Sequence, residues 1–248
     1  MLQLTGDYPG AERAYERALA ICEDLGWRFG RGNLLNSLGH VWMKTGDYSA
    51  AVQAHRQTLG IFRDLDDPYG VANATMRLGA VLTLTGAAYP AAAEALEEAL
   101  GSFRELGNRM SEGNALTYPG ILRRHTGDYP VAAQALDEAL GIFRDIGDRG
   151  GEVEALNERA AVHRLGGELP EAAHGHLQSL ELSREIGSPP DEAQALAGLG
   201  RCARAAGRIE QAETLLREAL SILLRLGVAE AATVAAELDA LPDAPAPP

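Results

Sequence analysis

The sequence is poor in the residue types that build sheets. Aromatic residues make up only 5% of the 248 residues, and runs of β-branched residues are absent, although 46% of the chain is apolar. Because sheets are rich in β-branched and aromatic residues, whereas alanine and leucine favour helices, this balance predicts packed helices. The apolar share is high enough for a core along most of the chain, which argues against disorder.

Cysteine is also scarce. Cys22 and Cys202 are the only two, and their spacing matches no metal-binding or redox motif. We expect two buried or unreactive thiols in a reducing compartment. No signal peptide opens the sequence, and no apolar run approaches the ~20 residues that a membrane-spanning helix needs. The sequence therefore predicts a cytoplasmic protein without a membrane partner.

Positive charge is limited as well. The chain has 22 Lys and Arg against 35 Asp and Glu, which gives a net charge of −13, and Lys44 is its only lysine. Phosphate backbones are bound by clustered cations that displace counterions. This charge balance argues against a nucleic-acid partner.

Catalytic motifs are missing too. The sequence has no glycine-rich phosphate loop, H-E-x-x-H, Cys-x-x-Cys or G-x-S-x-G. His174 and His176 would point about 200° apart on a helix, so we interpret them as surface residues rather than joint metal ligands. His55 and His163 occupy packing positions and are expected at the edge of the core. We expect no enzyme, no cofactor and no metal site.

What the chain does have is an internal repeat. The quartet Thr-Gly-Asp-Tyr begins at Thr5, Thr45 and Thr126, with degenerate copies near 85, 166 and 206. A second mark, Leu or Ile followed by Gly or Asp, begins at 25, 65, 106, 146, 186 and 226. Both marks have a period of 40, with one extra residue in the third copy. Such a period is typical of repeat proteins.

Each mark has a physical meaning. A glycine can take the left-handed conformation that ends a helix, and an Asp side chain can cap the first free amides of the next helix. Between the marks, Ala132, Leu136, Ala139 and Leu140 fall at i, i+4, i+7 and i+8, which is helical spacing. The repeat unit is therefore predicted to be two antiparallel helices.

These residues resemble a known family. The pattern Leu35-x-x-Leu38-Gly39-x-x-Trp42, followed by Ala51, resembles the tetratricopeptide repeat, and looser copies occur at Leu78-Gly79 and Leu199-Gly200. The resemblance implies an all-α fold, an α-α superhelix of about 12 antiparallel helices with a concave groove. The 40-residue period is closest to arrays in peptide-binding scaffold proteins and in C-terminal regions of bacterial STAND-type regulators.

The repeat marks also predict the organisation of the chain. We expect one array over residues 1–240, made of a half repeat (1–26), five full repeats (27–66, 67–107, 108–147, 148–187 and 188–227) and a capping helix (229–240), followed by a flexible proline-rich tail (241–248). The first pair is incomplete, because Met1–Leu4 corresponds only to the end of a first helix. This indicates a fragment of a longer array or a truncated start, and it predicts a homo-oligomer formed through uncovered Ala11, Tyr15 and Leu19.

The first helices of such an array line its concave face, so their inward stripe is the candidate binding surface. Its members are mostly amides and basic groups: Asn33, Asn36, His40, Asn73, Arg77, Asn114, Tyr118, Arg124, His125, Asn157, Arg164, Gln194, Arg201 and Arg204. Amides donate and accept, so they can pair with the backbone of an extended peptide. The alternative is that these amides brace neighbouring helices.

The basic groups of the stripe favour an acidic partner, because arginine forms forked hydrogen bonds to carboxylates. The alternative is a solvated face with internal Arg–Glu pairs. Pro119 lies beside Gly120 in the first helix of the repeat at 108–147, and it predicts a kinked but continuous helix. The kink is either tolerated without a role or opens the groove around Tyr118.

The leading functional hypothesis is a protein interaction module that binds a peptide or a partner domain, with an acidic ligand, along the concave face. One alternative is a regulatory or sensor segment of a larger bacterial ATPase or transcriptional regulator. Another is a receptor for short signalling peptides.

Overall fold

The structure is a computed structural model that describes residues 7–242. These residues form twelve α-helices and no strand, which confirms the predicted all-α fold. The helices are α1 (Tyr8–Asp24), α2 (Arg28–Thr45), α3 (Tyr48–Asp64), α4 (Pro68–Thr85), α5 (Tyr89–Glu105), α6 (Arg109–Thr126), α7 (Tyr129–Ile146), α8 (Arg149–Leu165), α9 (Leu169–Ile186), α10 (Pro189–Ala205), α11 (Ile209–Leu226) and α12 (Glu230–Asp239).

The repeated sequence marks form the turns between helices. Gly46 and Gly127 end α2 and α6 with φ values of 92° and 82°, in the left-handed region as predicted. The Asp47 side chain accepts a hydrogen bond from the backbone at the start of α3, and Asp7 does the same for α1. Asp128 accepts no such bond at the start of α7, so the predicted side-chain cap is wrong there.

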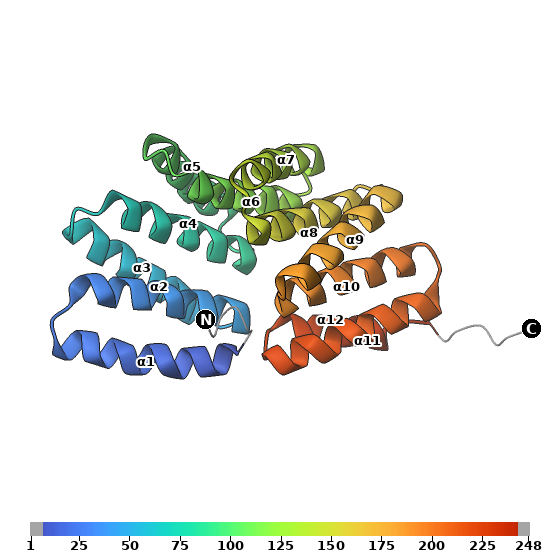
Figure 1. The fold of residues 1–248 in the computed structure, drawn as a ribbon, viewed down its shortest axis with the longest axis horizontal. Coiled ribbons are helices and arrows are strands. Elements are labelled where there is room, and N and C mark those ends of the chain that lie inside the picture. The colour runs from blue at the N-terminus through green and yellow to red at the C-terminus, as the bar shows by residue number, and fades with distance from the viewer. Residues whose placement is uncertain (1–6, 243–248) are drawn as a thin grey trace, which may run out of the picture.

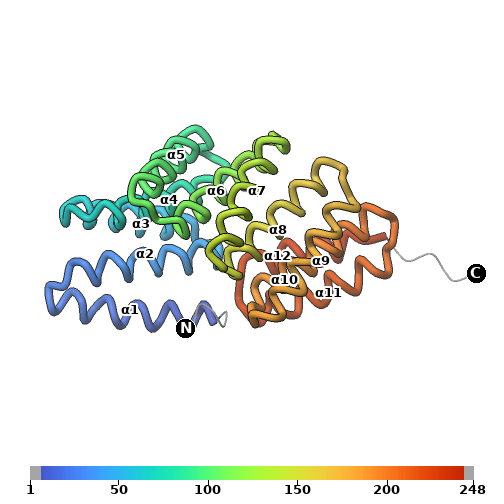
Figure 2. Tube along the Cα trace, turned by 45° about the horizontal axis from the view of Figure 1, so that its top comes forward, coloured from blue at the N-terminus to red at the C-terminus, as the bar shows by residue number. Residues whose placement is uncertain are grey.

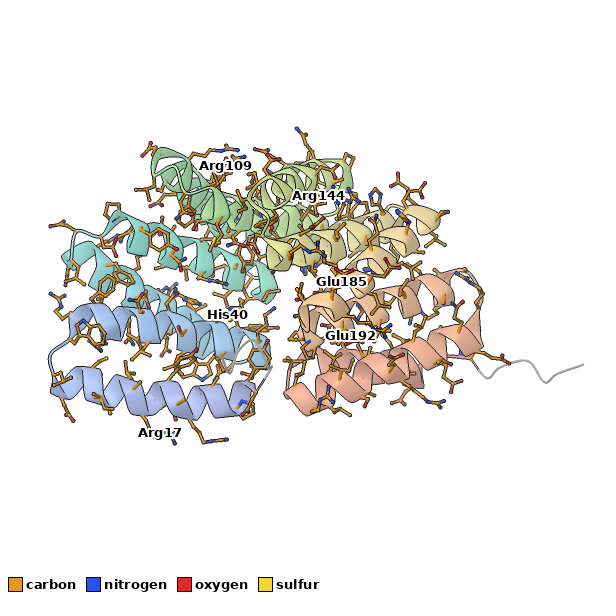
Figure 3. All side chains as sticks on the ribbon, viewed as in Figure 1. Arg17, His40, Arg109, Arg144, Glu185 and Glu192 are labelled. Atoms are coloured by element: carbon orange, nitrogen blue, oxygen red, sulfur yellow. The ribbon has the colours of Figure 1, made fainter. Side chains whose placement is uncertain are left out.

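The helices stack in two layers. Inner helices α2, α4, α6, α8 and α10 contact one another in sequence order, and the odd-numbered helices pack outside them (Figure 2). Small residues allow this close approach: Ala92 on α5 is fully buried, and a Cβ added to Gly79 on α4 would lie 2.8 Å from Leu96. Arg17, on the outer helix α1, points away from the molecule (Figure 3). The inner layer therefore forms the concave side.

The stack curls until its two ends meet (Figure 1). The backbone N–H of Ala229, in the turn between α11 and α12, donates a hydrogen bond to the carbonyl of Lys44 near the end of α2, at 3.1 Å. An apolar cluster of both ends surrounds this bond. We call this contact the seam; its residues are Tyr8, Ala11, Val41, Lys44, Leu226, Val228 and Ala229. The seam closes the superhelix into a ring.

The seam covers the apolar face that we expected to be exposed at the N-terminal end, so that expectation is wrong. Ala11 is only 1% exposed, and Tyr15 packs against the same cluster, because the C-terminal end of the chain covers them. Self-association through this end stays a prediction, and the exposed apolar surface left for it is at Ile21 on α1 and at Leu25 directly after this helix. Met1–Leu4 and the tail beyond residue 242 lie outside the described residues.

The helix that contains Pro119 is continuous. α6 runs through Pro119 without a break, as expected. The adjacent Gly120 packs closely on α7, since an added Cβ would lie 2.6 Å from Leu136. The segment is an ordinary inner helix with one unusual residue.

Candidate binding cavity

The concave side of the ring holds a cavity of about 510 Å³. Most of its wall comes from the inner helices and α12. Outer helices add residues such as His176 on α9, and the seam contributes Tyr8 and Leu226. A pocket of about 200 Å³ adjoins it and shares Lys44, Arg124 and Glu158. Ligand-binding pockets usually have volumes of roughly 300–1,000 Å³. The candidate site is therefore a concave cavity that is partly open to solvent, with a volume in the range of ligand sites.

Two of the predicted arginines are held by carboxylates inside this cavity. Arg124 Nε lies 3.1 Å from Glu158 Oε2, and Glu158 also accepts a hydrogen bond from the Gln194 amide at 2.9 Å. Arg201 Nε lies 3.0 Å from Glu237 Oε2 on α12. The alternative interpretation of the stripe, internal Arg–Glu pairs, thus describes these two arginines.

Two other cations in the cavity, Lys44 and Arg164, form no ion pair with any residue between 7 and 242. The Nε of Arg164 is buried without a hydrogen-bond partner in this part of the chain. Desolvation lowers the pKa of Arg164, and the positive charge of Arg201 lowers it further. A ligand anion beside Arg164 would relieve both penalties.

Lys44 differs from Arg164 because acidic groups surround it at a distance. Desolvation alone would lower the pKa of Lys44, but the charges of Glu154 and Tyr8 raise it overall. Burial raises the pKa of Glu154 and of Asp191, and Lys44 opposes both shifts. The charges that shift the pKa of Lys44 are therefore mainly acidic, whereas the charge with the largest effect on Arg164 is the positive charge of Arg201.

Amide and histidine side chains brace the inner helices. Asn36 donates to Asn73 Oδ1 at 2.7 Å and pairs with His55 Nδ1 at 2.9 Å, while Asn157 pairs with His176 Nδ1 at 3.1 Å. These contacts join neighbouring helices, as in the alternative interpretation of the amide ladder.

A second set of contacts links three inner helices. Arg77 on α4 donates to Tyr118 Oη on α6 at 2.9 Å and lies 3.3 Å from His40 Nδ1 on α2. His40 lies among these neighbouring helices in Figure 3. Burial, together with the charge of Arg77, holds the pKa of His40 well below its ordinary value.

His176 is not a surface residue, and that interpretation is wrong. Its side chain is 2% exposed and lines the cavity, whereas His174 is exposed as expected. Gly198 on α10 makes room for the ring, because an added Cβ there would lie 2.3 Å from it. Burial lowers the pKa of His176 to about 3, so the ring is neutral.

The structure brings half of the predicted stripe together around the cavity and its adjoining pocket. The lining members are Tyr118, Arg124, His125, Asn157, Arg164, Gln194 and Arg201. The other seven are not among the lining residues of the part described: Asn33, Asn36, His40, Asn73, Arg77, Asn114 and Arg204. Asn33 and Arg204 are exposed to solvent.

Sequence reasoning missed several lining residues, among them His176, Asp191 and Glu237. For His176 a signal existed, since it occupies the same position of its repeat as His55, which was assigned to packing. For Glu237 on α12 the repeat gives no signal, because the expected capping helix is not aligned with the inner helices.

No helix in residues 7–242 is both long and apolar enough to cross a membrane.

Family comparisons identify a repeat in the sequence. Two family profiles, both described as tetratricopeptide repeat, match residues 152–225 and residues 1–25. No curated protein matches the chain.

Solved structures share the fold. BtubC (BKLC) from P. vanneervenii is 19% identical, with a TM-score of 0.62 over 98% of this chain and 94% of that one. NprR in complex with its cognate peptide NprX is 14% identical, with a TM-score of 0.72 over 92% and 65%. A STAND protein with a tetratricopeptide repeat sensor from Pyrococcus horikoshii is 19% identical, with a TM-score of 0.56 over 87% and 34%. The chain therefore spans about two thirds of NprR and one third of the STAND protein.

Proposed function

Because the chain is a tetratricopeptide repeat protein, we propose that it is a binding module, rather than an enzyme, that holds a peptide segment of a partner in the central cavity. The observation that carries the proposal is the cavity itself, which has the volume of a ligand site and presents polar groups such as Arg164 and Gln194. NprR, which is similar in fold, was solved with a bound peptide, and this likeness favours a peptide ligand.

The charge of the cavity sets the character of the ligand. Arg164 and Lys44 lack ion-pair partners in the described residues and favour a ligand with a carboxylate. Five carboxylates also line the cavity or its adjoining pocket: Glu154, Glu158, Asp191, Glu230 and Glu237. They disfavour a run of acidic residues by like-charge repulsion. The proposed ligand is therefore a short segment with one or two negative groups.

A regulatory role is a second candidate, and the seam favours it. Tyr8, Lys44, Leu226 and Ala229 belong both to the seam and to the cavity lining. A ligand in the cavity would contact both sides of the seam and thereby change the balance between closed and open rings. This coupling is what a sensor segment of a larger regulator requires.

The test is capture of peptides from a pool of randomised hexapeptides by the immobilised protein, followed by calorimetry with individual peptides. Ala161→Trp fills the cavity, since Ala161 lines it, and should abolish capture. Ala20→Trp, at an exposed position of α1, is the matched control and should leave capture unchanged. Equal capture by both variants would place the ligand outside the cavity and overturn the proposal.

A further inference from the structure

The pocket that adjoins the central cavity differs from it in size and lining. Its volume is about 200 Å³, whereas sites for drug-sized ligands usually have roughly 300–1,000 Å³, so the adjoining pocket fits a smaller molecule. Part of its wall is apolar and consists of Met43, Ala80, Leu84 and Ile121. Its charged lining residues are Lys44, Arg124, Glu154, Glu158 and Glu230. The pocket therefore combines an apolar wall with charged groups of both signs.

Two of the five charged lining residues, one of each sign, have no ion-pair partner in residues 7–242. They are Lys44 on α2 and Glu154 on α8, and neither side chain forms a hydrogen bond in this part of the chain. The other three belong to ion pairs, which are Arg124–Glu158 and Arg201–Glu230. Lys44 is exposed and Glu154 is partly exposed, so a ligand in the pocket can reach both side chains.

The charges of Lys44 and Glu154 act on each other without direct contact. Burial raises the pKa of Glu154, and the charge of Lys44 opposes this shift. Desolvation would lower the pKa of Lys44, but acidic neighbours raise it overall, and Glu154 has the largest effect among them. Because no ion pair joins the two side chains, a molecule that carries both an ammonium and a carboxylate can lie between them and pair with each.

A third polar group on the pocket wall can bind an anion. The hydroxyl of Tyr118 accepts a hydrogen bond from Arg77 at 2.9 Å, and it donates to no acceptor in residues 7–242. A tyrosine hydroxyl both donates and accepts, so its hydrogen is available to a ligand. Tyr118 is partly exposed and lines the same pocket as Lys44. A carboxylate placed near Lys44 therefore has a second donor on this wall.

The overall balance of charge favours a ligand without net charge. Five carboxylates line the cavity and the adjoining pocket together, and the four lysine or arginine side chains that line them are Lys44, Arg124, Arg164 and Arg201. A ligand with a large charge of either sign would meet repelling groups as well as attracting ones. A zwitterion avoids this penalty and supplies a partner to each of the two unpaired groups in the pocket.

We propose that the adjoining pocket binds a free α-amino acid with an apolar side chain. The ammonium group of the ligand donates to the carboxylate of Glu154, and its carboxylate accepts from the Lys44 ammonium and the Tyr118 hydroxyl. Its side chain packs against the apolar wall that includes Ile121. This inference goes beyond the proposed function, because it assigns a second, smaller ligand to a pocket beside the peptide cavity.

The experiment uses four probes with the full chain. Leucine has all three features, leucinamide lacks the carboxylate, N-acetylleucine lacks the ammonium, and glycine lacks the apolar side chain. Lys44 is the only lysine of the chain, so protein labelled with ¹³C at lysine gives one set of side-chain NMR signals, which report on this pocket. We expect leucine to shift these signals and to bind about tenfold or more tightly than each of the other three probes.

Two pairs of variants test the two charged groups by calorimetry with leucine. Glu154→Gln and Lys44→Gln should each weaken binding about tenfold or more, because each removes one charged partner of the ligand. Glu97→Gln and Arg204→Gln are the matched controls and should bind leucine as the parent does, since Glu97 and Arg204 are exposed and do not line the pocket. The probe series needs only the parent protein, so it tests the proposal even if a variant does not fold.

Several results would overturn the proposal. Leucinamide resembles the amino end of a peptide and N-acetylleucine resembles the carboxyl end, so an affinity equal to that of leucine for either would identify a peptide end as the occupant. Equal affinity for glycine, leucine binding that Glu154→Gln leaves unchanged, or no binding of leucine would also contradict it. Capture of hexapeptides without binding of leucine would leave the proposed function standing while this inference failed, and leucine binding without hexapeptide capture would do the reverse.

Discussion

The same pair of side chains occurs twice in the ring, three repeats apart, and its two copies have different surroundings. Asn36 pairs with His55, and Asn157 pairs with His176, through the same atoms. Both rings are buried, and burial lowers the pKa of each histidine to about 3. Only His176 is among the cavity-lining residues of the described chain.

Small residues decide where each ring lies. In the N-terminal copy the small residues are Gly39 on α2 and Ala54 on α3, and an added Cβ on Gly39 would lie 2.6 Å from the ring of His55. In the C-terminal copy the two small residues are exchanged, with Ala160 facing Gly175. The methyl group of Ala160 takes the place where the N-terminal copy packs its ring.

The next inner helix completes the difference. Arg77 on α4 occupies the same position of its repeat as Gly198 on α10, and its side chain contacts His40 and Tyr118. Gly198 has no side chain at this position, and the ring of His176 packs against it instead. The Asn–His pair is the same in both copies, and the differences at Ala160 and Gly198 alone make His176 part of the cavity wall.

Among the tests that compare His55 with His176, we expect acidification to have the largest effect on the free energy of unfolding. Both histidines have folded pKa values of about 3 against an ordinary value of 6.5. The unfolded chain therefore binds more protons below pH 6.5, so stability is complete above pH 6.5 and is lost as the pH falls toward 3. We expect His55→Gln and His176→Gln each to remove about 2 kcal/mol of the loss in unfolding free energy between pH 6.5 and 4.5.

Urea denaturation at several pH values measures this loss. His174→Gln is the matched control, because His174 is exposed on the same helix as His176, and it should behave as the parent does. Burial raises the pKa of Glu154 and of Asp191, which acts in the opposite direction but is common to all variants and cancels in the differences. A parent-like pH profile for His176→Gln would show that its ring titrates normally.

Filling the two glycine positions gives the next effect. Gly198→Ala and Gly39→Ala should each lower the free energy of unfolding by about 1–2 kcal/mol, because the added methyl group meets a buried ring. Gly141→Ala, where an added Cβ meets nothing, should raise it by about 0.5–1 kcal/mol. Thermal and urea denaturation provide the measurement.

Ligand binding separates the two glycines. Gly198→Ala should also weaken the capture of hexapeptides in the cavity, whereas Gly39→Ala should leave it unchanged, since His55 is not among the lining residues found in 7–242. Equal effects of the two substitutions on binding would contradict the distinction between the two histidine sites.

The smallest effect compares a paired with an unpaired arginine. Arg124→Gln should lower the free energy of unfolding by about 1 kcal/mol, because it removes the charged partner of the buried Glu158 carboxylate. Arg164→Gln should raise it by a few tenths of a kcal/mol, roughly, since a desolvated charge without a partner is removed. A marked loss of stability in Arg164→Gln would indicate a structural partner for this arginine.

Much of the architecture follows from local sequence. The glycine marks predict the turns because a left-handed helix end is a local property, and the buried alanines predict the helix pairs because their spacing is periodic. Seven stripe residues, including Arg164, also face the cavity or its adjoining pocket. Local rules suffice where each repeat contacts only its neighbours.

Closure of the superhelix and the position of the His176 ring in the cavity wall cannot be predicted from these local rules. The seam joins Lys44 to Ala229, and their meeting depends on small rotations that accumulate over the intervening repeats. The position of the His176 ring depends on Ala160 and Gly198, which lie on two other helices. Comparing it with His55 would have predicted its burial, although not its exposure to the cavity.

The seam also constrains the order in which the chain folds. In an open array each helix pair can stack on its neighbour as soon as both have formed, and most contacts are local. The bond from Ala229 to the carbonyl of Lys44 brings together segments from opposite ends of the chain, and the repeats between them must stack first. We therefore expect ring closure to follow stacking of the repeats, and the cavity to be complete only in the closed ring.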